Sequence, residues 1–218
     1  MTHHPLAASR PVPQGAGAAP LALPHRNAQG TARRPAAPAP DCIAVTDQQA
    51  RQAAELEQRY DLLKYLKVPT QPSDDLDKMA SDMARETGFL YGFVNLFLGE
   101  QTFVGLHQPP AGSGHFVIGR TMSLEHGWCP EVVNRRKSLP LHDVHASPRF
   151  SGNHVVDAVG IRSYFGAPLI HESGVVLGTV CVIDPEKRHL EQAERLRDTV
   201  IEGAARVMKH LAPPAPGR

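Results

Sequence analysis

The sequence RSYFGAPLIH (162–171), followed by ESG (172–174) and VVLGTVCVID (175–184), decides the fold. Both longer runs are rich in β-branched and aromatic residues, so they predict two strands joined as a hairpin. Gly174 supplies the positive φ that such a turn requires. In the second strand the residues facing either way are mainly apolar, which predicts a central strand covered on both sides.

A second hairpin and three helices lie outside this one. Residues 89–98 and 101–107 predict paired strands around a turn at Gly99-Glu100, and periodic apolar residues predict the helices. The helices are expected at 47–68, where Asp47 follows Thr46 as a cap, at 73–88 and at 190–211. Between them we expect a loop at 108–119, a short helix within 123–137 at about 129–134, a short strand at 139–144 and a long irregular stretch at 145–160.

Hairpins near both ends imply antiparallel pairing, with the helices packed on the sheet. The sequence therefore predicts an α+β fold with an antiparallel sheet of about five to six strands. It does not predict a doubly wound nucleotide fold.

Residues 1–40 differ in composition from the rest of the chain. They hold eight prolines, eleven alanines, four arginines and no acidic or aromatic residue. Such a stretch has too little apolar surface to offset its ordering entropy, which predicts a disordered tail, as for residues 213–218. The tail is interpreted as a solubilising leader; weak contact with an acidic partner and an organelle transit peptide are the alternatives.

Charge and cysteine content exclude several classes of protein. Residues 41–218 carry 19 basic and 22 acidic residues without a dense Lys/Arg run, which argues against nucleic-acid binding. No apolar run of 18 residues exists, so no membrane span is expected. Three cysteines do not make a disulfide framework, and a cytoplasmic location fits best.

Three segments together resemble the GAF domain family. LPLHDVHASPRFSGNHVV (139–156) is similar to the family's strand, aspartate and following loop. GIRSYFGAPL (160–169) and GVVLGTVCVIDPEKRHL (174–190) are similar to its closing strands, and TMSLEHGWCPEVV (121–133) to its short helix. The resemblance covers about residues 76–211, so we expect a GAF domain at 69–212 preceded by a dimerisation helix at 41–68.

The resemblance implies a ligand pocket roofed by the short helix and the long loop. In this chain it would be lined by Phe93, Met122, Trp128, Cys129, Asp143, Phe150, Ile161 and Tyr164. Plain core packing is the alternative for each of them. The resemblance also implies a homodimer formed through the first and last helices, with a signalling protein as a possible further partner.

Catalytic motifs are expected to be absent. Cys129 lies near the start of a short helix with His126 three residues before it, a pattern that favours a reactive thiol. Some GAF proteins reduce free methionine sulfoxide with clustered cysteines. Here Cys129 and Cys181 are 52 residues apart and Cys181 is expected in an inaccessible strand, so a packed thiol is favoured.

The histidines give no clear metal site. His142 and His145 flank Asp143 at a spacing that places them on opposite sides of a strand or loop. With His154 they are interpreted as loop histidines, and no metal ligand is expected. No nucleophile elbow, phosphate loop, bilin-type cysteine or cyclic-nucleotide signature is found, so no cofactor is assigned.

Three functions follow from these patterns. The first is a sensor in signal transduction that binds a small molecule and passes its occupancy to a partner through helix packing. The second is an interaction module with a collapsed pocket. The third is a thiol-dependent reductase of methionine sulfoxide.

Overall fold

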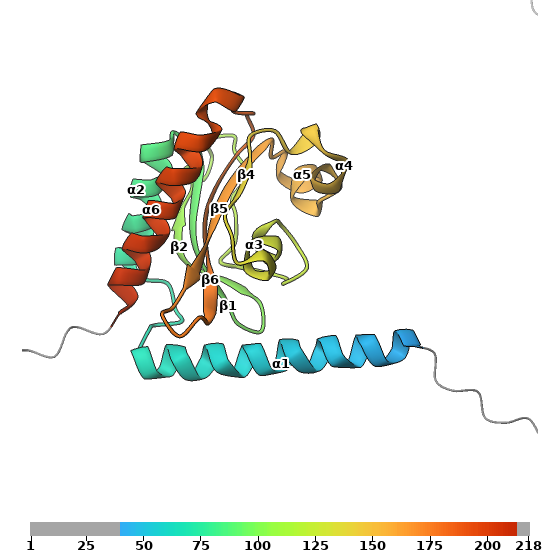
Figure 1. Cartoon of the computed structure of the whole chain (residues 1–218). Helices are drawn as coiled ribbons and strands as arrows, with labels where there is room; N and C mark the ends of the chain where they lie inside the picture. Colours follow the sequence, from blue (N-terminus) through green and yellow to red (C-terminus); the bar gives the residue numbers. More distant parts are fainter. Residues whose placement is uncertain (1–39, 213–218) are drawn as a thin grey trace, which may run out of the picture. The chain divides into compact units, whose positions relative to one another are not determined.

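The fold is built on one antiparallel six-stranded sheet. A computed structural model describes residues 40–212, apart from the side chains of residues 40–46 and 48. The strand order is β3-β2-β1-β6-β5-β4, with β1 and β6 at the centre (Figure 1). The strands are β1 Tyr91–Phe97, β2 Gln101–His107, β3 Thr121–Met122, β4 Leu139–Leu141, β5 Ser163–Ile170 and β6 Val176–Asp184. This is the expected α+β architecture; the two tails expected to be disordered lie outside the described residues.

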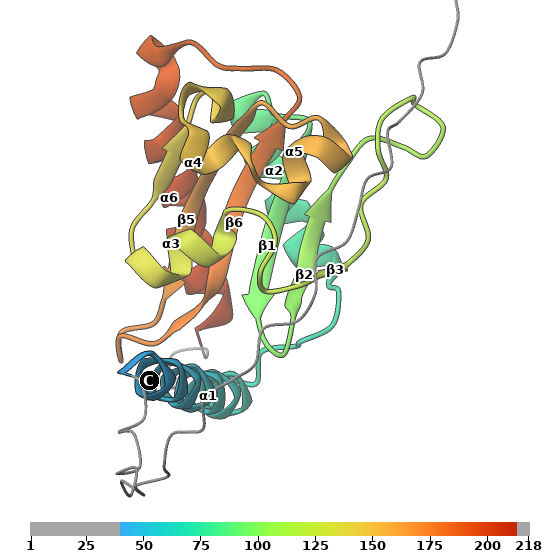
Figure 2. The same ribbon diagram turned by 90° about the vertical axis from the view of Figure 1, so that its right-hand side faces the viewer.

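Helices cover both faces of the sheet. On one face lie α2 (Asp74–Thr87) and α6 (Ala193–Leu211), and on the other lie α3 (Cys129–Arg135), α4 (Pro148–Ser151) and α5 (His154–Val159) (Figures 1 and 2). We call these the helical face and the pocket face. Every residue of β1 and β6 is buried, so the central position predicted for residues 175–184 is confirmed.

Two sequence predictions about the elements are wrong. The stretch 145–160 is not irregular, because it holds α4 and α5, whose four and six residues are too short for a periodic pattern. Helix α1 (Pro40–Leu66) begins seven residues before the expected start at Asp47. The two-residue strand β3 lies between the loop expected at 108–119 and the segment 123–137, at residues for which no element is predicted.

The helical face is a continuous apolar core. Leu76, Val94, Leu177 and Val200 are completely buried within it. Helix α2 lies close to the strands, because a Cβ at Gly105 would stand 2.4 Å from the Leu76 carbonyl oxygen. The close approach therefore requires glycine in β2.

Helix α1 is attached to the sheet by its C-terminal half. Leu63 and Leu66 are buried in the core of the helical face. Arg59 is 9% exposed, and its Nε donates a hydrogen bond to the Val176 carbonyl oxygen at 2.7 Å. The start of β6 and α1 are thus joined by a buried polar contact as well as by apolar packing.

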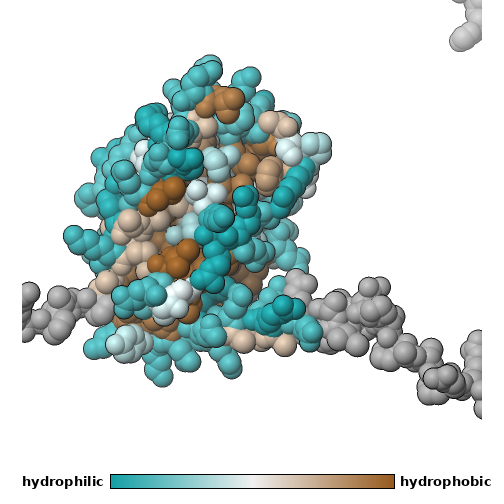
Figure 3. All heavy atoms as spheres, in the orientation of Figure 1, coloured by the Kyte–Doolittle hydropathy of each residue, from teal (hydrophilic) through white to brown (hydrophobic). Residues whose placement is uncertain are grey.

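The surface in the view of Figure 3 is mainly hydrophilic, with hydrophobic atoms showing between the polar ones in several places. Tyr60 and Tyr65 of α1 and Ile201 of α6 are among the large exposed apolar side chains. Within residues 40–212, no helix has the length together with the apolar composition that a bilayer crossing requires.

Candidate functional site

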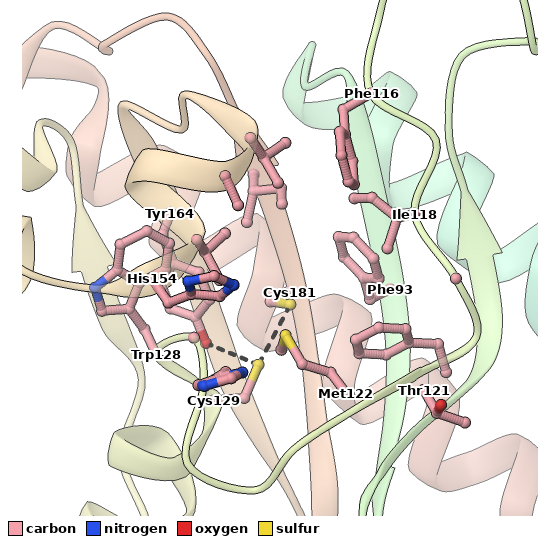
Figure 4. Close-up of a pocket in the computed structure, with 18 residues that line it drawn as sticks. Phe93, Phe116, Ile118, Thr121, Met122, Trp128, Cys129, His154, Tyr164 and Cys181 are labelled. Carbon is pink, nitrogen blue, oxygen red and sulfur yellow. Dashed lines mark hydrogen bonds between the residues drawn. The ribbon is translucent and has the colours of Figure 1, made fainter.

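A cavity of about 220 Å³ lies on the pocket face, between the sheet, α3, α5 and the segment before α3 (Figure 4). Its floor comes from the central strands and its walls from the covering segments. The aromatic lining residues are Phe93, Phe103, Phe116, Trp128 and Tyr164, and the large aliphatic ones are Ile118, Met122, Val155, Val159 and Ile183. The cavity is therefore bounded mainly by apolar side chains, as is usual for small-molecule sites.

The structure brings five of the eight residues predicted for the site to this cavity. They are Phe93, Met122, Trp128, Cys129 and Tyr164. Ile161 is completely buried in the core beside it, and Phe150 contributes its carbonyl oxygen, which accepts a hydrogen bond from Trp128 Nε1 at 3.2 Å. A binding role for any of the eight stays a prediction.

Asp143 does not line the cavity; its carboxylate makes hydrogen bonds that stabilise the loop. Its Oδ1 accepts the His145 N–H at 3.0 Å and caps the 3₁₀ turn Val144–Ala146. Its Oδ2 accepts a hydrogen bond from Arg162 Nη2 at 2.9 Å. The hydrogen bonds from Arg162 lower the pKa of Asp143 against a smaller effect of burial, so the carboxylate holds the loop to β5.

The sequence reasoning missed lining residues in the strands. Phe103, Cys181 and Ile183 were not assigned to the site, although all three line it. Cys181 is paired directly with Phe93 across β1 and β6, and the Phe93 and Phe103 rings are 5.0 Å apart. The alternation of side chains along β1 from Phe93 indicates which residues of that strand face the cavity. Adding the residues of β6 also requires the pairing of β1 with β6.

The two cysteines lie side by side. Cys129 Sγ and Cys181 Sγ are 3.6 Å apart, although 52 residues separate them in sequence. Cys129 is 4% and Cys181 3% exposed, yet both line the cavity (Figure 4). The buried strand position expected for Cys181 is confirmed, but the expectation that the two cysteines are not clustered is wrong. The helices that cover this face of β6 leave a cavity that both cysteines line.

Hydrogen bonds favour the thiolate of Cys129. The bond with the Cys181 thiol contributes most, and Thr179, Tyr164 and Asn95 add to it, so the pKa of Cys129 falls to about 7 although burial raises it. Tyr164 Oη donates to Cys129 Sγ at 3.4 Å. The pKa of Cys181 is raised well above its usual range by the same thiol–thiol bond and by burial. The pair is thus asymmetric, with the negative charge on Cys129.

A buried polar chain positions the segment before α3. Asn95 Nδ2 donates to Gln101 Oε1 at 2.9 Å, and Gln101 Nε2 donates to the carbonyl oxygens of Ser123 and His126 at 2.6 and 2.8 Å. Asn95 and Gln101 are both completely buried. Asn95 Oδ1 has no hydrogen-bond partner within the described residues, but the three hydrogen bonds that the chain does make fix the start of α3 over the cavity.

A second clamp joins that segment to α5. Asn153 Nδ2 donates to the Gly127 carbonyl oxygen at 2.7 Å, and the Gly127 N–H donates to Asn153 Oδ1 at 3.2 Å. The same Oδ1 caps α5 by accepting from the Val155 N–H at 3.1 Å. One asparagine therefore fixes both walls of the cavity.

The cavity offers few charged groups. None of its lining residues is an aspartate, glutamate, lysine or arginine. His126 and His154 line it, with ring centroids 4.8 Å apart. Within the described part of the chain, no three His, Cys, Asp or Glu side chains are grouped so as to hold a metal ion.

Comparisons with known proteins identify the family. The GAF domain model matches residues 72–206. No curated protein matches the chain. Similar solved structures include the GAF domain of an Acinetobacter phosphoenolpyruvate-protein phosphotransferase, with 15% identity, 72% of this chain and 92% of that chain covered, and a TM-score of 0.49.

Two further structures are similar in the same way. Free methionine-R-sulfoxide reductase from Neisseria meningitidis has 15% identity, 73% and 90% coverage, and a TM-score of 0.47. A GAF sensor protein from Burkholderia vietnamiensis has 21% identity, 73% and 92% coverage, and a TM-score of 0.42. Because the family model spans more than half of the residues, the chain belongs to the GAF domain family.

Proposed function

We propose that this GAF domain is a sensor whose cavity binds a small, neutral, largely aromatic or apolar molecule. The observation that carries the proposal is the cavity itself, which has aromatic walls and no acidic or basic lining residue other than histidine. Its volume of about 220 Å³ exceeds the roughly 150 Å³ of an apolar cavity that holds benzene. One substituted ring fits this space.

The few polar groups in the cavity favour a ligand with a donor or acceptor on its ring. Among the residues that line it, Thr121 and His154 are exposed, His126 is half-buried, and the thiols of Cys129 and Cys181 are buried. Benzamide, a neutral ring with one donor and one acceptor group, is therefore a suitable probe.

Trp128 makes the test specific to the site. It is the single tryptophan of the chain, it is 3% exposed, and its ring lies 5.3 Å from that of Tyr164. Benzamide titrated into the purified chain should change the intrinsic tryptophan fluorescence with a saturable dependence. A strictly linear dependence, or none, would remove neutral aromatic molecules as the ligand class.

A matched pair of variants locates the binding. Ala158→Trp adds a bulky ring to an exposed position of α5 that lines the cavity, whereas Asp157→Trp adds the same ring one residue away, outside the lining. Ala158→Trp should abolish the stabilisation of the fold by benzamide in thermal unfolding, and Asp157→Trp should keep it. Equal stabilisation in both variants would place the probe elsewhere.

We also propose that occupancy reaches α1 through α3. The start of α3 forms the cavity wall, and Arg136 after its end donates to the Gly174 carbonyl oxygen in the turn before β6. Val176 follows this turn, and its carbonyl oxygen accepts the hydrogen bond from Arg59 of α1. A shift of α3 would therefore be transmitted through these hydrogen bonds to α1, which has an exposed face.

That exposed face supports the dimer proposal. Tyr65 and Tyr60 are 77% and 46% exposed on α1, so each offers an aromatic surface that a second copy of the chain would bury. Tyr65→Glu should convert a dimer of the full chain into a monomer in light scattering, and Lys64→Gln, which also lowers the net charge by one, is the control for the change in charge. A dimer that persists in Tyr65→Glu would exclude this face as the interface.

Reduction of methionine sulfoxide is the second candidate, favoured by the adjacent thiols. A free amino acid carries an ammonium and a carboxylate group, and the cavity lining has no acid and no lysine or arginine to bind them. The sensor is therefore our first proposal. Turnover of free methionine sulfoxide with thioredoxin as reductant, lost in Cys129→Ser, would reverse this order.

A further inference from the structure

The adjacent thiols have the arrangement of a redox pair. Their sulfurs are 3.6 Å apart, and a disulfide needs about 2.05 Å, so closing the bond requires a movement of about 1.5 Å. Cys129 belongs to the seven-residue helix α3, which lies beside the cavity, whereas Cys181 is fixed in the central strand β6. We therefore expect the start of α3, and not β6, to move when the bond closes.

The cavity gives small molecules a route to sulfurs that are otherwise buried. Both cysteines line it, and Figure 4 shows the two sulfur atoms facing each other, with Trp128 on one side and Met122 on the other. A hydroperoxide is small and neutral, so the apolar lining does not exclude it. A bulky or charged oxidant lacks such a path.

Partners for a thiolate surround Cys129. Tyr164 donates a hydrogen bond to its sulfur. The Thr179 hydroxyl is completely buried and has no hydrogen-bond partner within the described residues, and it lowers the pKa of Cys129. Hydroxyl and thiol donors that point at one sulfur stabilise its anion, the form that attacks oxidants.

We propose that Cys129 and Cys181 are a peroxide-oxidised pair that closes into a reversible disulfide at the cavity. The Cys129 thiolate attacks one peroxide oxygen, the O–O bond breaks, and the leaving oxygen takes a proton to give water or an alcohol. Cys129 is then a sulfenic acid. The Cys181 sulfur attacks the Cys129 sulfur, the S–O bond breaks, and the hydroxide leaves as water with the Cys181 proton.

The electrons balance over these two steps. Two thiols are oxidised by two electrons to one disulfide, and one hydroperoxide is reduced by two electrons. The same asymmetry that puts the charge on Cys129 makes Cys181 the resolving thiol. Once Cys129 is the neutral sulfenic acid, it no longer opposes the ionisation of Cys181.

The decisive experiment uses the full chain with Cys42→Ser, so that only the two cavity cysteines remain. Hydrogen peroxide at an equimolar ratio should remove two hydrogen atoms from the intact mass and reduce the number of alkylatable thiols from two to none. Dithiothreitol should restore both. An unchanged thiol count, or a product that gains oxygen without losing thiols in pairs, overturns the proposal.

The roles of the two sulfurs are tested in the same background. Cys181→Ser should stop at the Cys129 sulfenic acid, seen as one added oxygen and as a dimedone adduct. Cys129→Ser should react about fivefold to tenfold more slowly at pH 7, because the remaining thiol is largely protonated and its higher nucleophilicity offsets this only in part. Equal rates in the two variants contradict the assignment.

Two controls keep the outcome clear. Peptide mapping of the Cys42→Ser chain at early times identifies the first oxidised sulfur even where a single-cysteine variant fails to fold, and early sulfenic acid on Cys181 overturns the assignment. Disulfide formation needs no ligand. A chain that fails to bind benzamide but forms the disulfide therefore separates this proposal from the proposed function.

Discussion

The two faces of the sheet differ in what the same central strands present to them. On the helical face β1 places Val94 and β6 places Val180, and both are packed in a continuous apolar core. On the pocket face the neighbouring residues are Asn95 on β1 and Cys181 on β6, beside a cavity. One face is filled by two long helices, whereas the other is covered by three short helices that leave space.

This difference indicates that the helical face contributes most of the stability, whereas the pocket face carries the groups that could bind or react. Apolar side chains fully enclosed by other side chains contribute most of the stability, since a void costs the contacts of its whole lining. The pocket face lacks part of that packing. It carries buried polar groups instead, such as Gln101, which is hydrogen-bonded to specific partners, and Asn95, whose Nδ2 is bonded while its Oδ1 has no partner within the described residues. The helical face is therefore expected to tolerate change least.

Truncations on the two faces test this expectation with the largest effect. Leu177→Ala, at a completely buried position of the helical face, should lower the free energy of unfolding by about 2–5 kcal/mol. Met122→Ala enlarges an existing cavity next to a partly buried side chain and should cost less than half as much. Urea denaturation measures both, and equal losses would contradict the division between the faces.

Much of the fold could be predicted from the sequence. The two hairpins and α6 were predictable because long alternating or periodic apolar runs and turn residues such as Gly174 act locally; its φ is 86°. The helices α4 and α5 were not, because four to six residues give no period. Their starts are set instead by Pro148 in α4 and by the Asn153 cap of α5.

The candidate site was less predictable, because it depends on which strands pair. Sequence separation indicated that Cys129 and Cys181 were unrelated, yet pairing of β1 with β6 and the position of α3 over β6 bring their sulfurs together. Asp143 shows the opposite case. A carboxylate in a conspicuous motif was assigned to the pocket, whereas it caps a turn and pairs with Arg162.

The ion pair between Asp77 and Arg120 connects the two faces and gives a smaller effect. Arg120 lies just before β3, and both of its terminal nitrogens donate hydrogen bonds to Asp77 of α2 at 2.7 Å. Asp77 also accepts a hydrogen bond from the Leu106 N–H at 2.7 Å. Asp77→Asn should lower the free energy of unfolding by about 1 kcal/mol, since the pair is partly exposed. Asp75→Asn, at an exposed position of the same helix, is the control and should cost almost nothing.

The same pair predicts a pH dependence. Burial raises the pKa of Asp77, but the hydrogen bonds from Arg120 and Leu106 outweigh it and hold the pKa below its ordinary value. The stabilisation is therefore complete above the unfolded pKa of about 4 and is lost as the pH falls through the lower folded pKa. The stability difference between wild type and Asp77→Asn should narrow below about pH 4. If the stability difference between wild type and Asp77→Asn widened in that pH range, the loss of stability in the variant would have a cause other than the ion pair.

The thiol pair allows a comparison within the pocket face. In the Cys42→Ser chain, alkylation of Cys129 by iodoacetamide should rise with pH around a midpoint near 7, because its pKa is about 7. Cys181→Val removes the main hydrogen bond to that sulfur and should move the midpoint to higher pH. Cys181→Ser keeps a donor and should move it less. A midpoint that is unaffected by Cys181→Val would show that Cys181 does not stabilise the thiolate.

The smallest expected effect joins the proposed ligand to the proposed redox pair. A molecule such as benzamide in the cavity lies on the path to both sulfurs. Saturating benzamide should therefore slow disulfide formation by hydrogen peroxide about threefold, which corresponds to about 0.65 kcal/mol in the barrier. Stopped-flow tryptophan fluorescence follows the reaction, because Trp128 precedes Cys129 and moves with α3. Ala158→Trp, which blocks the same cavity permanently, should slow the reaction without benzamide and lose the response to it. If benzamide binds but leaves the rate unchanged, peroxide reaches the thiols by another route, and the cavity serves the ligand alone.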